Sequence, residues 1–246
     1  MDHLAQSRPH ALTHRSKSIA LLALAIFAIV ALFTLTGCGS SDSDADSADG
    51  SAGSGSSGEA ASGTCSYPAD EQSAAKEVKA PAEKPKAEDS VDATIKTSAG
   101  DLAVVLDAER VPCTVNSFLS LADQQYFDDT DCHRLTTEGI FVLQCGDPTG
   151  TGSGGPGYSF ADELDGSETY PAGTLAMANA GPDTNGSQFF VVYDDSSLPP
   201  DYTVFGSLDE ASTKTVADIA AKGTDSGSGD GAPKEKVTIT GITAAQ

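Results

Sequence analysis

LAMANAGPDTNGSQFF, residues 175–190, is the stretch that decides the fold and the site of this chain. Apolar runs stand at its two ends and extend outward as GTLAMANA (173–180) and SQFFVVY (187–193), with turn-forming residues between them. Short apolar runs separated by Gly, Pro, Asn and Asp predict two neighbouring β-strands. The stretch contains no His, Cys, Lys or Arg and a single carboxylate, Asp183, so it lacks the reagents of most enzyme chemistry.

Further strands and two helices are predicted on both sides of this stretch. The strand patterns are DATIKTSAGDLAVVLD (92–107, a hairpin), DCHRLTT (131–137) and IFVLQCGD (140–147) as a pair, YTVFGSL (202–208) and KVTITGIT (236–243). The helical patterns are TVNSFLSLADQQYF (114–127), with Thr114 as its N-cap, and EASTKTVADIAAKG (210–223), which ends at Gly223. Many short strands with two helices predict one mainly β domain, closed or sandwiched, over residues 91–246.

Residues 1–37 predict an export signal. Arg8, Arg15 and Lys17 precede an uncharged apolar run from Ser18 to Gly37, the order of a signal segment. A transmembrane helix is the alternative, because about 20 apolar residues span a bilayer. LTGC (35–38) resembles the lipobox of bacterial lipoproteins, in which the Cys is acylated. We therefore expect Cys38 to be lipidated, with this anchor as the only contact with the membrane, and the rest of the chain to be extracytoplasmic.

Residues 38–90 predict a disordered linker. They are rich in Gly, Ser, Ala and Asp and then in spaced prolines, and offer little apolar surface to bury. CSYPADEQ (65–72) interrupts this composition; a plain linker is expected there too, with packing against the domain through Cys65 or Tyr67 as the alternative.

Charge excludes some partners. Residues 39–246 carry 11 basic and 35 acidic side chains, a net charge of −24. Such a surface repels nucleic acid and anionic lipid headgroups, so neither is expected as a partner. We expect a monomer.

The four cysteines after Cys38 and the one histidine that follows the predicted signal segment, His133, form no catalytic motif. Cys65, Cys113, Cys132 and Cys145 predict one or two disulfides, with Cys132–Cys145 weakly favoured because these residues flank a predicted hairpin. A thiol-redox protein is the alternative, although no CxxC occurs. His133 is expected to be structural, bonded to neighbouring backbone. No metal site is expected.

A glycine-rich segment predicts a loop rather than a cofactor site. GTGSGG (150–155) matches the spacing of dinucleotide sites, which must open a helix, but Pro148 and Pro156 flank it. No cofactor is expected.

CHRLTTEGIFVLQCGDPTGTGSGGPGYSFADE (132–163), LAMANAGPDTNGSQFFVVY (175–193) and LPPDYTVFG (198–206) resemble the cyclophilin family of peptidyl-prolyl isomerases. The likeness runs from about Thr94 to Thr243 and implies an eight-stranded antiparallel β-barrel capped by two α-helices. It also implies isomerisation of Xaa-Pro bonds, here in unfolded or partly folded exported polypeptides. The alternative is a chaperone or scaffold that binds proline segments with little turnover.

This reaction explains the missing reagents. Rotation about a prolyl bond breaks no covalent bond and transfers no proton; its barrier is about 18–20 kcal/mol. Reaching an ordinary turnover requires about 4–7 kcal/mol of stabilisation, which a dry site and a few hydrogen bonds can supply.

The resemblance also implies the site. The catalytic arginine of the family corresponds to Arg134 in this sequence. The resemblance implies that Arg134 hydrogen-bonds the prolyl region as the amide nitrogen becomes pyramidal, and that Gln144 helps to hold the substrate backbone and orients Arg134. The other implied residues are Phe141, Val142, Phe190 and Leu198 around the proline ring with Met177 beneath or near it, Ala178, Asn179 and Ala180 as a wall, and Gln188 and Tyr202 at the rim.

The chain departs from the family pattern at several positions. Two extra residues lie between Arg134 and Phe141. Val142 stands where Met is frequent, Tyr202 where His is frequent, and Ser197 where Trp is frequent. The missing Trp predicts weak cyclosporin binding.

Overall fold

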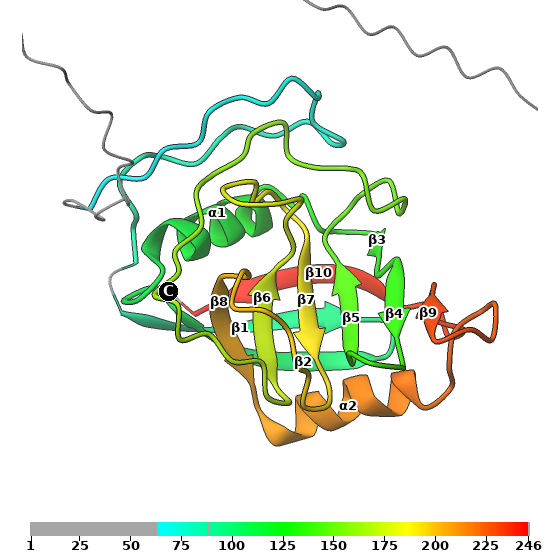
Figure 1. Ribbon diagram of the computed structural model, residues 1–246. Helices are drawn as coiled ribbons and strands as arrows, with labels where there is room; N and C mark the ends of the chain where they lie inside the picture. The colour runs from blue at the N-terminus through cyan, green and yellow to red at the C-terminus, as the bar shows by residue number, and fades with distance from the viewer. Residues whose placement is uncertain (1–62, 88, 246) are drawn as a thin grey trace, which may run out of the picture. The chain divides into compact units, whose positions relative to one another are not determined.

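The computed structural model of the chain describes residues 63–87 and 89–245 (Figure 1). The predicted signal segment, Cys38 and the first part of the predicted linker lie outside these residues. Within the two described ranges, no helix has the length and apolar character needed to cross a membrane.

The strands form one antiparallel sheet in the order β3-β10-β1-β2-β8-β6-β7-β5-β4-β9 (Figure 1). Without the two-residue strands β3 and β9, eight strands remain, so the prediction of an eight-stranded antiparallel fold is confirmed. The strands are β1 (Ser90–Thr97), β2 (Gly100–Asp107), β3 (Thr130–Asp131), β4 (Arg134–Thr136), β5 (Val142–Cys145), β6 (Thr174–Met177), β7 (Phe189–Val192), β8 (Val204–Leu208), β9 (Asp230–Gly231) and β10 (Thr238–Ala244).

Residues 130–136 join the two ends of the sheet. The first half of this segment bonds to the C-terminal strand: β3 pairs with β10, and Cys132 N donates to Val237 O at 2.9 Å. The second half bonds to β5, because β4 pairs with it and His133 N donates to Gln144 O at 3.0 Å. The segment therefore links β10 to β5 and closes the sheet into a barrel.

The two predicted helices are present as α1 (Pro112–Asp123) and α2 (Glu210–Ala220). The prediction of Thr114 as N-cap is wrong, because α1 begins two residues earlier, at Pro112, and Val111 at the N-cap makes no side-chain bond. Instead, Glu163 accepts from Cys113 N at 3.0 Å and from Thr114 N at 2.8 Å. A carboxylate from a distant loop thus satisfies the free donors at the helix start.

Side-chain alternation divides β5, β6 and β7 into an inner and an outer face. The inner residues belong to the main core: Leu143, Cys145, Leu175, Met177, Phe189 and Val191. Their neighbours form a second cluster outside it: Val142, Ala176, Phe190 and Val192, together with Tyr170. The sheet therefore presents apolar side chains on a face that the main core does not use.

Residues 63–87, here called the N-terminal strap, pack against the domain. Cys65 forms a disulfide with Cys113, and Tyr67 Oη donates to Cys113 O at 2.7 Å. The Tyr67 ring lies edge-on against Tyr158 and Phe160, each at 5.6 Å between centroids. The plain-linker prediction is wrong for these residues, since one disulfide and one half-buried ring hold them on the domain despite their polar composition.

The disulfide pairing uses every cysteine of the described residues. The favoured pair, Cys132–Cys145, is confirmed, and the other bond joins Cys65 to Cys113. The thiol-redox alternative therefore has no free thiol within the described part of the chain.

Candidate active site

A row of residues crosses four neighbouring strands on the outer face of the sheet. In the strand registers, Arg134 on β4 lies opposite Gln144 on β5, and Gln144 opposite Phe190 on β7. Phe190 in turn lies opposite Ala176 on β6. Antiparallel partners share a face of the sheet, so a guanidinium, an amide and an aromatic ring stand side by side.

The apolar part of this row belongs to what we call the outer apolar cluster. Predicted and unpredicted residues build it together: Ile140, Val142, Tyr170, Ala176, Ala178, Phe190, Val192, Leu198, Tyr202 and Val204. The Tyr202 ring stands edge-on to Phe190 at 5.5 Å between centroids, and Tyr170 Oη donates to Tyr202 O at 3.1 Å. Sequence reasoning missed five of them, although strand alternation puts Ala176 on the same face as Ala178: Ile140, Tyr170, Ala176, Val192 and Val204.

Arg134 is fixed at the polar end of the row. Its Nε and Nη2 donate to the two carboxylate oxygens of Asp230 at 2.9 and 2.6 Å, and its Nη1 donates to Gln144 Oε1 at 3.4 Å. Hydrogen bonding to Asp230 raises the pKa of Arg134, and Tyr202 adds a smaller contribution in the same direction. The guanidinium is therefore charged and oriented beside the outer apolar cluster.

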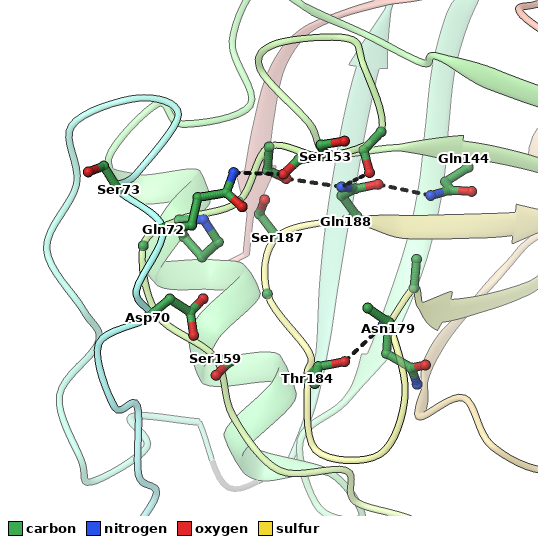
Figure 2. A pocket seen from close by; sticks show the side chains of 18 residues that line it. Asp70, Gln72, Ser73, Gln144, Ser153, Ser159, Asn179, Thr184, Ser187 and Gln188 are labelled. Carbon is green, nitrogen blue, oxygen red and sulfur yellow. Dashed lines mark hydrogen bonds between the residues drawn. The ribbon is translucent and has the colours of Figure 1, made fainter. Parts of the chain in front are cut away.

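A relay of amides continues from Arg134 into the glycine-rich loop (Figure 2). Gln144 Nε2 donates to Gln188 Oε1 at 2.9 Å. Gln188 Nε2 donates to Gly152 O at 2.9 Å and to Gly154 O at 3.0 Å. Both predicted amide residues thus have their orientation set, and the loop carbonyls determine it.

The loop folds around a carboxylate that sequence reasoning missed. Asp147 is fully buried and accepts from the backbone N–H of Thr149, Gly152 and Gly154 at 2.7, 2.7 and 3.0 Å. Burial raises the pKa of Asp147, but hydrogen bonds from Thr149, Gly154 and Gly152 more than offset this, so the pKa lies below its usual value. The amides that would bind a phosphate in a dinucleotide site here bind the chain's own carboxylate.

Gly154 must be glycine for this arrangement. A Cβ at this position would lie 2.0 Å from Asp147 Oδ1. The available signal for the role of Asp147 in the sequence was an acidic residue at the end of an apolar strand, three residues before the first glycine of the glycine-rich segment.

Asn179 presents unpaired backbone to the site. Its N–H and C=O make no hydrogen bond within the described residues, while its side-chain Nδ2 donates to Asp201 O at 2.8 Å. The neighbouring Ala178 N donates to Gln188 O at 3.0 Å. Pairing of Asn179 with an extended peptide stays a prediction.

Two predicted site residues, Phe141 and Met177, are not members of the outer apolar cluster. Met177 is 2% exposed within the main core, because it alternates with Ala176 on β6 and points to the inner face. Phe141 stands edge-on to Tyr193 at 5.9 Å between centroids and is not part of the outer apolar cluster. We therefore remove Met177 from the set of residues that contact the ligand, whereas contact of the half-buried Phe141 with the ligand stays a prediction.

The hydrogen bonds of His133 differ in part from those predicted. Its backbone N–H donates to Gln144 O, but neither ring nitrogen is bonded to backbone within the described residues, so the predicted bond between the ring and neighbouring backbone is wrong. Burial lowers the pKa of His133, with Asp147 acting in the opposite direction, so the ring is neutral at pH 7.

The longer turn after Arg134 packs against the segment that carries Asp230. Thr137 N donates to Gly229 O at 2.8 Å, and Thr136 pairs with Asp230 where β4 meets β9. The extra residues therefore pack onto the segment that carries the partner of Arg134.

The polar side of the site borders a cavity of about 440 Å³. Five predicted residues line it: Gln144, Ala178, Asn179, Ala180 and Gln188. Together with the outer apolar cluster and Arg134, the cavity completes the candidate site.

Known proteins are similar to this chain over the whole domain. A family profile described as "Cyclophilin type peptidyl-prolyl cis-trans isomerase/CLD" matches residues 92–244. "Probable peptidyl-prolyl cis-trans isomerase B" of Mycobacterium tuberculosis is 48% identical over 193 residues, 72% of this chain and 63% of that protein. "Probable peptidyl-prolyl cis-trans isomerase A" of Mycobacterium leprae is 40% identical over 172 residues, 61% of this chain and 90% of that protein.

Solved structures agree with the fold. The crystal structure of a Cryptosporidium parvum cyclophilin type peptidyl-prolyl cis-trans isomerase in the presence of the dipeptide Ala-Pro has a TM-score of 0.55 and 34% identity. The match covers 63% of this chain and 99% of that one. The present chain spans 63% of the length of the mycobacterial isomerase B.

Proposed function

Because the chain belongs to the cyclophilin-type peptidyl-prolyl cis-trans isomerase family, we propose that it accelerates rotation about Xaa-Pro peptide bonds. The observation that carries this proposal is the row on the outer face of the sheet, where Arg134 and Gln144 stand beside Phe190. The parasite relative crystallised in the presence of Ala-Pro supports the same substrate class.

The site holds the proline ring and the flanking backbone. The ring packs against the outer apolar cluster, chiefly Phe190, Val142 and Leu198, which removes it from water. The free N–H and C=O of Asn179 pair with the extended peptide. Binding of this kind fixes one side of the prolyl bond while the other side rotates.

Arg134 stabilises the twisted state. As the bond twists, amide resonance is lost and the nitrogen lone pair becomes localised, so it can accept a hydrogen bond. Asp230 occupies Nε and Nη2 of the guanidinium, which leaves Nη1 with a hydrogen beyond the one it donates to Gln144. A bond that strengthens only in the twisted state contributes to the required stabilisation of about 4–7 kcal/mol.

The test is Arg134→Ala in the full-length chain, purified in mild detergent because of the apolar run at residues 18–37. Isomerisation of a short Ala-Pro peptide is followed by NMR exchange, and we expect kcat/KM to fall about 10²–10³-fold, the cost of losing one transition-state donor. Arg134→Lys keeps the charge without the planar fork and should recover only part of the activity.

Thermal melting of each variant establishes that it is folded. Wild-type activity no better than that of folded Arg134→Ala would contradict the catalytic proposal and leave a proline-binding chaperone or scaffold.

We also propose that the chain is a lipid-anchored extracytoplasmic monomer whose substrates are exported polypeptides. The basic residues, apolar run and LTGC (35–38) at its start support this location. Replacing Cys38 by Ala should abolish incorporation of a labelled fatty acid and leave the chain unprocessed. Acylation that persists in Cys38→Ala would contradict the assignment of this residue.

A further inference from the structure

The N-terminal strap forms one wall of the cavity beside the outer apolar cluster. Asp70, Gln72 and Ser73 line the cavity from the strap, across from Asn179 and Thr184 (Figure 2). A cavity bordered by Gln144 and Asn179 adjoins the place where the peptide passes, so a side chain that flanks the proline can enter it.

The strap is a fixed wall. Asp70 N donates to Gly157 O at 3.0 Å, Ala75 N donates to Gly155 O at 2.9 Å, and Gln72 Nε2 donates to Ser153 O at 2.9 Å. The strap also touches the backbone of the loop, since a Cβ at Gly157 would lie 2.8 Å from Ala74 N. Asp70 is therefore held beside the cavity by backbone on both sides.

The side-chain amides of the cavity lining already donate hydrogen bonds within the protein. The NH₂ group of each lining amide donates within the protein: Gln72 to Ser153 O, Gln144 to Gln188 Oε1, Gln188 to Gly152 O and Gly154 O, and Asn179 to Asp201 O. The lining contains no Lys, Arg or His. The cavity therefore offers a ligand no positively charged group, while its carbonyl, amide and carboxylate oxygens can accept hydrogen bonds.

Asp70 is the charged acceptor among them. Its carboxylate is exposed and makes no hydrogen bond or ion pair within the described residues, and it is the one ionisable group of the cavity lining. The surrounding chain has a net charge of −22, which adds a field of the same sign. A donor with positive charge matches this environment, and an acidic side chain does not.

We propose that the cavity is a subsite for a Lys or Arg side chain of the substrate within three residues of its proline, and that Asp70 is its specificity-determining residue. This inference rests on the proposed function. The strap thereby takes part in choosing substrates, because it carries Asp70 into a cavity whose other walls belong to the barrel.

The experiment compares peptides in the full-length chain in mild detergent. Each peptide has one Ala-Pro bond and carries Lys, norleucine or Glu at one position flanking the proline. At one position, kcat/KM should be about two- to fivefold higher for Lys than for norleucine at low salt, the value of an exposed ion pair, and the ratio should fall in high salt. Glu at that position should be the poorest of the three.

Two matched variants identify the residue. Asp70→Asn should bring the Lys-to-norleucine ratio to about one, whereas Glu71→Gln, which makes the same charge change on the strap outside the cavity lining, should leave the ratio as in the wild type. A wild type without Lys preference at any position overturns the proposal, and so does a preference that survives in Asp70→Asn.

Failure of the proposed function gives a different result, because then no peptide, norleucine included, is turned over. In that case, the Kd values of the same peptides from NMR titration decide: an Asp70-dependent preference for Lys supports the subsite, and its absence overturns it.

Discussion

Arg134 and Asp230 form a two-pronged ion pair across 96 residues of sequence, with Nε–Oδ1 at 2.9 Å and Nη2–Oδ2 at 2.6 Å. Parallel bonds of this kind fix the plane of a guanidinium as well as its position. The pair lowers the pKa of Asp230, chiefly through the hydrogen bonds from Arg134. The carboxylate therefore stays charged, and Nη1 stays on the side of Gln144.

We expect Asp230→Asn to lower kcat about three- to tenfold with little change in KM, because a loosened Arg134 loses part of its transition-state bond. Stability should change by less than about 1 kcal/mol, since both side chains are substantially exposed. Peptide kinetics and urea unfolding measure the two effects. Asp225→Asn, in the same loop, is the control; an equal loss of kcat in both variants would assign the effect to the loop's net charge.

Asp147→Asn should destabilise the domain by about 1–3 kcal/mol at pH 7, because an amide cannot accept all the bonds that the buried carboxylate accepts. The pKa of Asp147 is lowered in the fold, so its contribution is complete above the unfolded value of about 3.9 and is lost as pH falls through the folded value. Urea unfolding from pH 7 to pH 3 should show wild type and variant converging. The control is the exposed Asp101→Asn, whose free energy of unfolding at pH 7 should equal that of the wild type. If the difference between wild type and Asp147→Asn stayed constant down to pH 3, the role given to the Asp147 carboxylate would be contradicted.

Removing the Cys132–Cys145 bond in a Cys132→Ala, Cys145→Ala chain should cost about 3 kcal/mol, the chain-entropy value for a short closed loop. The two residues are 13 apart in sequence and buried in the core. Urea unfolding of the double variant measures the loss. If the bond is absent in solution, adding a reductant to the wild type will leave the stability of this region unchanged, and titration will find free thiols.

Cyclosporin should inhibit the wild type weakly, at micromolar concentrations or above, because Ser197 stands where the family often has Trp. Ser197 is exposed beside Leu198 of the outer apolar cluster, so a larger ring there meets open solvent rather than packed core. Ser197→Trp should strengthen inhibition about tenfold or more, the usual contribution of a buried aromatic anchor. Nanomolar inhibition of the wild type would contradict this prediction, and Ser197→Ala is its control.

Local patterns predicted much of the fold and part of the site. Short apolar runs in GTLAMANA (173–180) and SQFFVVY (187–193), separated by turn-forming residues, predicted two strands, and they pair as β6 and β7. The two cysteines that flank a predicted hairpin are bonded. These features depend on residues that are close in sequence or on the spacing of apolar residues, and both can be read from the amino-acid sequence.

Other features required residues that are distant in sequence. The start of α1 depends on Glu163, 49 residues beyond Thr114, and so the cap could not be found from the helix pattern. The strap was read as linker because its composition is polar, whereas Cys113 and Tyr158 hold it in place. Met177 was assigned to the site because resemblance names a segment and not the face on which each of its side chains lies.

The sequence by itself determined which strands, helices and reactive groups this protein has, because backbone period and side-chain chemistry are local properties. Only the tertiary structure decided that Asp230 holds Arg134, that Asp147 shapes the loop behind Gln188, and that Asp70 borders the cavity. Hydrogen bonds and ion pairs act over a few ångströms, so Asp230 and Asp70 reach their places only when the barrel closes and the strap docks. The partners of Asp147 are close in sequence, but the conformation that turns their N–H groups toward it is set by the folded loop.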